Sequence, residues 1–345
     1  KMDSVKENYK NVFSTKFSIK CYTEEQEENW DSFVKQKSMN GTFLQTRKFI
    51  NYHPKDRFKD CSLMIYKGNT LTACVLGCEW IEEGEKVFFS HKGTTFGGIV
   101  IGKQIYNATS INELMDCMED YLREQQFDKI YLKMTPAVFE RENTDLLDYF
   151  LYQKGYEQYT ELNYYMHLNR YRENILSQFS AGKRRDYRYA LKNNLTFEKL
   201  ETKEQVMQFY DVLQINLKKL GLKSVHSYED LIDLKYNRFV QEIEFYGVFL
   251  EKKMIAGSMV FLFDGRIMHT QYLSSDEQYQ KLFPMDFLIY HLIECAVEKQ
   301  LELFTFGICT ENQGRYLNFG LSRFKEGFGT EFCLNKSFEK RLLLS

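Results

Sequence analysis

Hydrophobic and polar residues alternate along some segments of the chain, whereas in others hydrophobic residues recur at helical spacing. In the first half, two strands around a Gly-Asn turn are predicted in "SLMIYKGNTLTACVLGCEW", a strand in "KVFFS", a helix over 112–126, and strands in "DKIYLKM" and "YQKGYEQY". The second half repeats this order, with a hairpin in "FYGVFLEKKMIAGSMVFLF", a strand in "GRIMHTQYLSS", a helix over 285–299, and strands in "LELFTFGI" and "FKEGFGTEF". Helices over 27–37 and 203–220 precede the two hairpins.

The repeated order of elements indicates an internal duplication. Phe127 aligns with Leu301 at a separation of 174 residues, and Gly155 aligns with Gly327 at a separation of 172. The hairpins align at a separation of 183, so the first half carries about nine extra residues between its hairpin and its helix. We therefore predict an α/β fold with mixed (α+β) sheets in two similar domains, residues 1–168 and 169–345, with a ligand cleft between them.

The surplus of the first half contains "FFSHKGTTFGGIV", from Phe88 to Val100. Gly93, Gly97 and Gly98 allow the backbone to approach a ligand closely or to adopt positive φ. We predict that His91 is a general base or hydrogen-bonds the substrate, and that the substrate-binding residues include Ser90, Lys92, Gly97 and Gly98. The alternative is a long loop with a solvent-exposed histidine and no functional role.

Three further strings carry a family resemblance. "SAGKRRDYRYALKNNLTFEKL", "QYQKLFPMDFLIYHLIECAVEKQ" and "NFGLSRFKEGFGTEF" are similar to segments of tandem GNAT-type acyltransferase domains, as found in Fem-type aminoacyl transferases and related N-acyltransferases. The resemblance covers almost the whole chain and implies an acyltransferase. It also implies that Lys325 lies near the cleft as a catalytic residue. The sequence departs from the family pattern at one place. Acyl-CoA enzymes of this fold have a glycine-rich phosphate loop after the central strand, whereas the segment from Asp276 to Pro284 contains no glycine, which puts coenzyme A as donor in question.

A basic segment is the second candidate site. Arg184, Arg188 and Lys192 fall at i, i+4 and i+8 and so share one helix face. With Lys183 and Arg185 they are predicted to bind the phosphates of a donor, such as a diphosphate, a nucleotide or an RNA backbone. The alternative is a solvated helix face.

The third candidate is "HTQYLSSDEQYQKLFP". Strand alternation predicts that His269, Gln271 and Leu273 face one way and that Thr270 and Tyr272 face the other. Tyr272 is a candidate catalytic acid, and Asp276 and Glu277 are candidates for binding an amine. Pro284 suits the first turn of a helix whose N–H groups receive a phosphate or carboxylate, so the cofactor-binding candidates here are Tyr279, Lys281 and Pro284.

Composition excludes few partners. The 46 basic and 48 acidic residues nearly cancel, so an interaction with nucleic acid requires a local patch. The eight cysteines show no metal-site spacing; small buried residues explain Cys74 and Cys78, and no metal is expected. The longest apolar run, 255–263, is far shorter than the roughly 20 residues of a membrane span, and a cytoplasmic protein without an integral membrane segment is expected.

These observations predict an N-acyltransferase that moves an acyl group, such as acetyl, from acyl-CoA to an amine of a sugar or cell-envelope precursor. No tightly bound cofactor and no DNA partner are expected. The alternatives are a Fem-type ligase that takes an amino acid from aminoacyl-tRNA, and a binding protein of the same fold without turnover.

Overall fold

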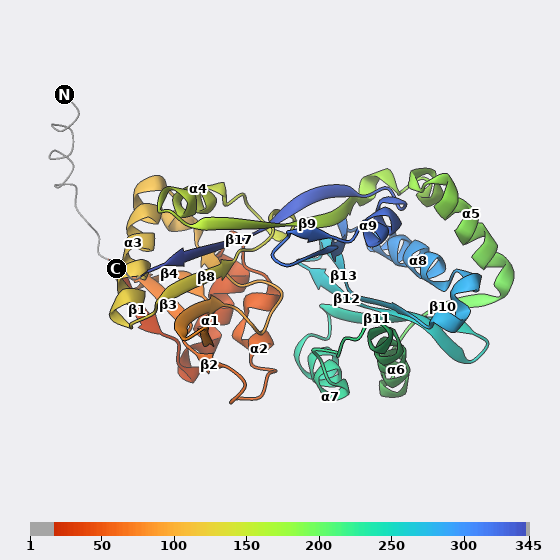
Figure 1. The fold of residues 1–345 in the computed structure, drawn as a ribbon, viewed down its shortest axis with the longest axis horizontal. Coiled ribbons are helices and arrows are strands. Elements are labelled where there is room, and N and C mark those ends of the chain that lie inside the picture. Colours follow the sequence, from red (N-terminus) through yellow and green to blue (C-terminus); the bar gives the residue numbers. More distant parts are fainter. Residues whose placement is uncertain (1–16, 343–345) are drawn as a thin grey trace, which may run out of the picture.

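The computed structural model describes residues 17–342. Within that range the strands form a sheet of eleven, a sheet of four and a two-stranded ribbon. Figure 1 shows two lobes side by side, with the long strands β9 (Glu157–His167) and β17 (Glu331–Arg341) running from one lobe to the other.

The first lobe is built largely from the N-terminal half. Its elements are β1 (Phe17–Cys21), α1 (Glu27–Ser32), α2 (Arg47–Ile50), β2 (Lys59–Asp60), β3 (Leu63–Lys67), β4 (Thr70–Val75), β5 (Cys78–Glu82), β6 (Glu85–Ser90), β7 (Ile99–Ile101), α3 (Ala108–Glu124), β8 (Lys129–Lys133) and α4 (Asp145–Gln153). The four-stranded sheet has the order β1-β3-β4-β7, and α3 packs against β1.

The second lobe follows β9 in the chain. Its elements are α5 (Ala181–Ala190), β10 (Leu195–Lys199), α6 (Lys203–Lys219), α7 (Tyr228–Ile232), β11 (Ile243–Leu250), β12 (Lys253–Phe263), β13 (Ile267–Ser275), α8 (Pro284–Glu298), β14 (Leu303–Ile308), β15 (Thr310–Glu311), β16 (Tyr316–Leu317) and α9 (Phe319–Glu326). Helix α6 packs against β12 and β13, as does α8, and α5 packs against α8.

One continuous sheet joins the two lobes. Its order is β10-β11-β12-β13-β14-β9-β17-β8-β6-β5-β2. Strand β9 of the first half pairs with β14 of the second half, and the C-terminal strand β17 lies between β9 and β8. Since the halves exchange strands in this way, the chain order does not divide the sheet at one point, and the boundary near Asn169 stays a prediction.

A shared hydrophobic core also joins the two halves. It contains Phe43, Phe49, Phe96 and Phe139 from the first half, and Phe209, Phe239, Phe245, Phe261 and Phe263 from the second. Phe43 lies at the centre of this core, with ring centroids 5.0 Å from both Phe239 and Phe263 and 5.3 Å from Phe261. Such aromatic contacts resist separation of the halves because they bury large apolar surfaces.

Hydrophobic period predicted the main helices well. The helix expected over 203–220 spans Lys203–Lys219, and the one expected over 285–299 spans Pro284–Glu298. The helix expected from residue 112 begins at Ala108, because the Asn107 side chain caps it by accepting a hydrogen bond from the Ser110 backbone N–H.

Two expectations about local structure were wrong. "SLMIYKGNTLTACVLGCEW" contains three strands rather than two, since β5 leaves the hairpin β3–β4 and joins the large sheet. "FKEGFGTEF" is mostly not a strand, because α9 continues to Glu326 and β17 begins only at Glu331. Lys325 therefore lies in a helix.

The strand exchange makes a testable prediction about stability. Phe338 of β17 is fully buried in the core of the first half, so Phe338→Ala should lower the free energy of unfolding by about 3–5 kcal/mol. Leu334→Ala on the same strand should cost about 1 kcal/mol or less, because Leu334 is 47% exposed. Urea unfolding of both variants measures the difference, and equal losses would contradict this packing of β17.

Candidate functional site

Strands β13 and β14 are parallel neighbours that separate partway along their length. They pair from Ile267 with Leu303 to His269 with Thr305, and within the described chain no ladder pair joins them beyond that point. Each strand carries an irregularity there: Gln271 is an extra residue opposite β12, and Phe306 is an extra residue opposite β9. The carboxyl ends of parallel strands, where neighbours diverge, are a common place for a ligand.

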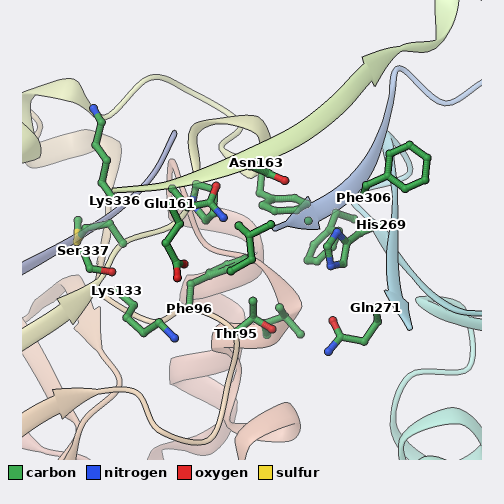
Figure 2. Close-up of a pocket in the computed structure, with 18 of the residues that line it drawn as sticks. Thr95, Phe96, Lys133, Glu161, Asn163, His269, Gln271, Phe306, Lys336 and Ser337 are labelled. Atoms are coloured by element: carbon green, nitrogen blue, oxygen red, sulfur yellow. The ribbon is translucent and has the colours of Figure 1, made fainter. Parts of the chain in front are cut away.

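A cavity of about 340 Å³ lies where these strands separate. One wall comes from β13 and β14, through His269, Thr270, Gln271 and Phe306. The facing wall comes from β8, β9 and β17, and the loop residues Thr95 and Phe96 complete it. The cavity therefore lies between the two halves, as expected, and Figure 2 shows Lys133 and Glu161 on one side of it and His269 and Gln271 on the other.

The bulge corrects the predicted orientation of side chains on β13. His269 pairs with Phe261 and Thr270 pairs with Val260, so these two keep the expected opposite faces. Tyr272, which was expected on the face of Thr270, packs instead in the shared core with Met259 and Phe261. The alternation changes only beyond Thr270, because Tyr272 pairs with Met259 and leaves Gln271 without a place in the ladder.

Polar side chains from three adjacent strands share the facing wall. Glu161 and Asn163 are two residues apart on β9, and Asn335 of β17 lies directly opposite Glu161. Lys133 of β8 lies opposite Ser337, two residues beyond Asn335. Because side chains two residues apart and cross-strand partners share one face of a sheet, this register brings all five to the cavity, which they line.

Two of these side chains, Asn163 and Asn335, have a buried acceptor atom that receives no hydrogen bond within the described chain. The Oδ1 atoms of Asn163 and Asn335 are buried and find no hydrogen-bond partner among residues 17–342. Buried acceptors normally have a partner, because leaving one unsatisfied costs about 1–3 kcal/mol. The wall is therefore suited to a ligand that donates hydrogen bonds.

Burial changes the proton affinity of the charged pair on this wall. It raises the pKa of Glu161 above its usual value, although the nearby positive charge of Lys133 opposes this shift. It lowers the pKa of Lys133, with Lys92 adding to the effect and Glu161 opposing it. A carboxylate with raised proton affinity beside a lysine with lowered affinity is suited to proton transfer near neutral pH.

Hydrogen bonds within the protein fix the wall of the cavity that β13 and β14 form. His269 Nδ1 lies 2.7 Å from Thr305 Oγ1, and burial lowers the pKa of His269 to about 4, so its imidazole is neutral at pH 7. Lys325 is 5% exposed, and its ammonium donates to the carbonyl oxygens of Phe306 at 3.1 Å and Ile308 at 3.0 Å. Lys325 thus lies behind the wall of the cavity and fixes the bent part of β14, and its catalytic role stays a prediction.

In the first half, the glycine-rich loop occupies the place that corresponds to the cavity, where two parallel strands stop pairing. Strands β6 and β8 are parallel there and pair as far as Ser90 with Leu132. Beyond that pair, Gly97 N–H donates to the Lys133 carbonyl at 2.9 Å and Gly98 N–H donates to Ser90 Oγ at 2.8 Å. Gly97 and Gly98, which were expected to approach a ligand, instead approach these strand ends, and Gly93 approaches His53 and Phe58. Substrate binding by Ser90, Gly97 and Gly98 stays a prediction.

His91 and Lys92 point to other parts of the first half. His91 is 1% exposed, which excludes the solvent-exposed loop histidine considered as the alternative, and it lines a second pocket within that half. Lys92 is exposed, with its ammonium 4.2 Å from the ring centroid of Phe89 and 4.8 Å from that of Trp80. Neither residue lines the cavity between the halves.

Helix α5, which carries the predicted basic residues except Lys192, lies on the outer side of the second lobe (Figure 1). Lys183 pairs with the buried Asp286 of α8 at 2.7 Å, and Arg184 donates to the Phe179 carbonyl at 2.7 Å. Arg185 pairs with Asp186, and Arg188 and Lys192 are exposed. These residues do not line the cavity, so a ligand reaching both would have to be large.

The predicted residues between β13 and α8 make local contacts. Asp276 caps the short helix 277–282 by accepting from Gln278 N–H, Glu277 pairs with Lys219, and Tyr279 hydrogen-bonds Lys253. Lys281 is exposed and Pro284 is the first residue of α8.

Tyr272, the predicted catalytic acid, contacts His226 of the second half. Its hydroxyl oxygen lies 2.6 Å from His226 Nδ1, and burial raises the pKa of Tyr272 to about 12. The roles assigned to these residues stay predictions.

Sequence patterns missed Lys133, Glu161, Asn163 and Asn335. The alternation of β9 placed Glu161 and Asn163 on one face, which was the available signal. Their approach to Asn335 depends on the pairing of β9 with β17, which no local pattern reveals. Among residues 17–342, no group of three or more His, Cys, Asp or Glu side chains is arranged to hold a metal ion. No helix in that range is both long enough and apolar enough to cross a membrane.

Comparisons with known proteins identify the domain and the fold. Residues 178–326 match a family described as acetyltransferase (GNAT) domain. No curated protein matches the chain.

Among solved structures, FemX is 14% identical, with a TM-score of 0.67 over 94% of this chain and 97% of that one. L-PGS from Bacillus licheniformis is 14% identical, with a TM-score of 0.59 over 92% of each chain. A tandem GNAT protein from the clavulanic acid biosynthesis pathway is 7% identical, with a TM-score of 0.56 over 96% of this chain and 100% of that one. The predicted tandem GNAT-like fold is confirmed by these structures, and the acyltransferase prediction is confirmed by the domain match together with the fold.

The packing of the glycine-rich loop against β8 leads to a prediction about stability. Gly98 and Gly84 both have positive φ, at +69° and +83°, so alanine strains the backbone at either site. A Cβ at Gly98 would also meet Met134 and the Lys133 carbonyl at 2.8–3.0 Å, whereas one at Gly84 meets nothing within 4 Å. Gly98→Ala should therefore cost about 1–3 kcal/mol more than Gly84→Ala in urea unfolding, from overpacking. Similar losses would show that the loop does not pack tightly on β8.

Proposed function

We propose that this tandem GNAT-fold acyltransferase acylates a primary amine in the cavity between its halves. The observation that carries the proposal is the cluster of Glu161, Asn163 and Asn335 opposite the separated ends of β13 and β14. One wall offers acceptors for an amine, and the other offers strand edges for an acyl donor.

The acceptor wall matches the hydrogen bonds of an ammonium group. A primary ammonium has three N–H donors, and the wall presents the Glu161 carboxylate with the Oδ1 atoms of Asn163 and Asn335, which lack a partner in the described chain. The amine must lose a proton before it attacks a carbonyl. Glu161, whose pKa is raised by burial, takes that proton, and Lys133 balances the negative charge of its carboxylate before the transfer.

The strand wall suits an extended acyl donor. Beyond His269 and Thr305 the facing edges of β13 and β14 do not pair with each other within the described chain. Peptide groups there that Lys325 does not engage are available to a chain that carries amides of its own. A backbone N–H on such an edge can stabilise the oxyanion formed on attack. The amine nitrogen then forms the new amide bond, the bond from the acyl carbon to sulfur breaks, and the thiolate leaves and takes up a proton.

We assign acyl-CoA as the donor, with acetyl as the simplest acyl group, and an amine of a sugar or cell-envelope precursor as the acceptor. Support for this donor comes from the GNAT domain match, since thioesters of coenzyme A are the usual co-substrates of such domains. Support for a polar acceptor comes from the polar wall.

A second candidate donor is an aminoacyl-tRNA. The N-terminus of α8 favours it, because Pro284 supplies no N–H there and the buried Asp286 places a carboxylate where a diphosphate would bind. The same chemistry would then break an ester bond to oxygen instead of a thioester. L-PGS from Bacillus licheniformis and a domain of a putative lysylphosphatidylglycerol synthetase from Agrobacterium fabrum have a similar fold. Arg185 and Arg188 of α5 and Lys192, which follows α5, are exposed and offer a surface for RNA.

Incubation with each donor separates these candidates. The protein is mixed with acetyl-CoA or with bulk charged tRNA, each together with a panel of amines that includes glucosamine and lysine, and the release of thiol or of labelled amino acid is followed. Thermal shift accompanies the assay, because a ligand at 100 times its Kd stabilises the protein by about 2.7 kcal/mol. Thiol release supports acyl-CoA, and amine-dependent deacylation of tRNA supports the second donor. Binding without turnover in both arms would leave a binding protein and overturn the proposal.

The assigned base generates a prediction about rate and pH. Glu161→Gln should lower kcat by about 10²–10⁴-fold, because glutamine keeps the shape but cannot take a proton. In the wild type, kcat/KM should fall as the pH decreases through the raised pKa of Glu161, since the protonated acid is not a base. That acid limb should be absent from the residual activity of the variant.

A matched control is available on the same strand. Glu157 belongs to β9 but is exposed and does not line the cavity, so Glu157→Gln should retain wild-type rates and the same pH profile. If Glu161→Gln behaved like Glu157→Gln, Glu161 would not be the base.

A further inference from the structure

A second pocket, of about 580 Å³, lies entirely within the first half of the chain. We call it the Arg47 pocket. It lies beside α1 and α2 at the end of β6, and its lining includes Tyr22, Glu27, Arg47, Asn51, Phe58 and His91. It shares no lining residue with the cavity between the halves.

His91 presents a buried donor to this pocket. Its Nδ1 accepts a hydrogen bond from Gly93 N–H at 2.8 Å, so the proton of the neutral ring is on Nε2. Burial lowers the pKa of His91 to about 3, which keeps the ring neutral. The side chain is 1% exposed, and Nε2 has no hydrogen-bond partner within residues 17–342.

Arg47 presents a second buried donor. Its terminal nitrogens donate to Ser62, Asn51 and Asp60, and its guanidinium stacks on Tyr22 at 3.8 Å from the ring centroid. The side chain is almost fully buried, yet Nε has no partner in the described part of the chain. Arg47 Nε and His91 Nε2 are therefore two buried donors at this pocket. Since buried donors are normally satisfied, these groups call for an oxygen acceptor.

The charges around the pocket exclude a simple anion as its best ligand. Asp60 is paired with Arg47 at 2.6 Å, and Glu24 is paired with Lys55 at 3.0 Å. Glu27 has no salt-bridge partner among residues 17–342 and accepts only from Asn51 Nδ2, at 3.3 Å. The formal charge left at the pocket is therefore negative, and Glu27 favours a cation.

Arg47, which needs an acceptor oxygen, and Glu27, which favours a cation, lie close together. Asn51 joins them, because its Oδ1 accepts from Arg47 at 3.1 Å while its Nδ2 donates to Glu27. One carboxamide therefore separates the group that needs an acceptor oxygen from the group that needs a cation. A ligand that carries a carboxylate and an ammonium a few bonds apart satisfies both.

We propose that the Arg47 pocket binds an α-amino acid with an apolar side chain. Its carboxylate accepts from Arg47 Nε and His91 Nε2, and its ammonium donates to Glu27. Its side chain contacts the apolar surfaces of Ile50, Pro54 and Phe58, which also line the pocket. The volume exceeds what glycine or alanine fills, so a branched or aromatic side chain fits best.

Calorimetric titration with matched probes tests this assignment and requires no turnover, so it is independent of the proposed acyl transfer. L-leucine is compared with isoamylamine, which lacks the carboxylate, and with 4-methylpentanoate, which lacks the amine. Leucine should bind saturably, and each half-ligand should bind at least tenfold more weakly. No saturable binding of leucine or phenylalanine, or 4-methylpentanoate binding as tightly as leucine, would overturn the proposal.

Two variants locate the binding. Glu27→Gln removes the charge that holds the ammonium and should weaken leucine at least tenfold. Its control is Glu28→Gln, because Glu28 is the next residue of α1 but is exposed and does not line the pocket, so its affinity should stay within twofold of wild type. His91→Asn keeps an acceptor for Gly93 N–H and removes the Nε2 donor, and it should also weaken leucine at least tenfold.

Trp30 gives an independent readout of folding and binding. Its ring lies 5.6 Å from the Arg47 guanidinium, and Trp80 is the other tryptophan of the chain. In a Trp80→Phe background, leucine should change the fluorescence of Trp30 with the affinity that calorimetry gives, and native fluorescence of the variants confirms that they fold. Wild-type leucine affinity in both folded variants, Glu27→Gln and His91→Asn, would show that leucine binds elsewhere.

Discussion

The aromatic core shared by the two halves is the interaction on which the proposed site depends. Phe43 contacts Phe239, Phe261 and Phe263, and the same core reaches Phe96 and Phe139 at the edge of the cavity. The exchange of β9 and β17 adds hydrogen-bonded pairing across the same boundary. Burial of this apolar surface and the continuous sheet together hold one wall of the cavity opposite the other.

The two halves repeat one arrangement but use it differently. In each, a pair of parallel strands stops pairing partway, after Ser90 with Leu132 in the first half and after His269 with Thr305 in the second. The first half fills the position with its own loop, through Gly97 and Gly98, whereas the second half leaves a cavity. This difference accounts for the extra residues of the first half, and under the proposed function the acyl donor binds in the second half.

Local patterns revealed the elements but not their long-range pairing. Helical spacing located α6 and α8, and the duplicated order of elements identified the fold class. The polar wall could not be predicted, because Glu161 and Asn335 become neighbours only when the C-terminal strand pairs with β9. The bulge at Gln271 was also invisible, since strand alternation assumes an unbroken ladder. Lys325 was placed near the cleft by resemblance, and its hydrogen bonds to the bent part of β14 give it a structural role there.

The glycine cluster shows why composition alone is ambiguous. Glycine permits a close approach of the backbone to any neighbour, and here the neighbours are strand ends of the same chain. His91, which stands beside those glycines in the sequence, is directed by the same loop into the Arg47 pocket instead of the cavity. Residues adjacent in one motif therefore serve different parts of the fold.

The most direct test of the central claim is a crystal structure of the protein with a non-hydrolysable thioether analogue of acetyl-CoA and a primary amine. The account predicts the acyl group between the separated ends of β13 and β14, with the amine nitrogen within hydrogen-bond distance of Glu161 and Asn163. Both ligands bound elsewhere, with the cavity between the halves empty, would contradict it.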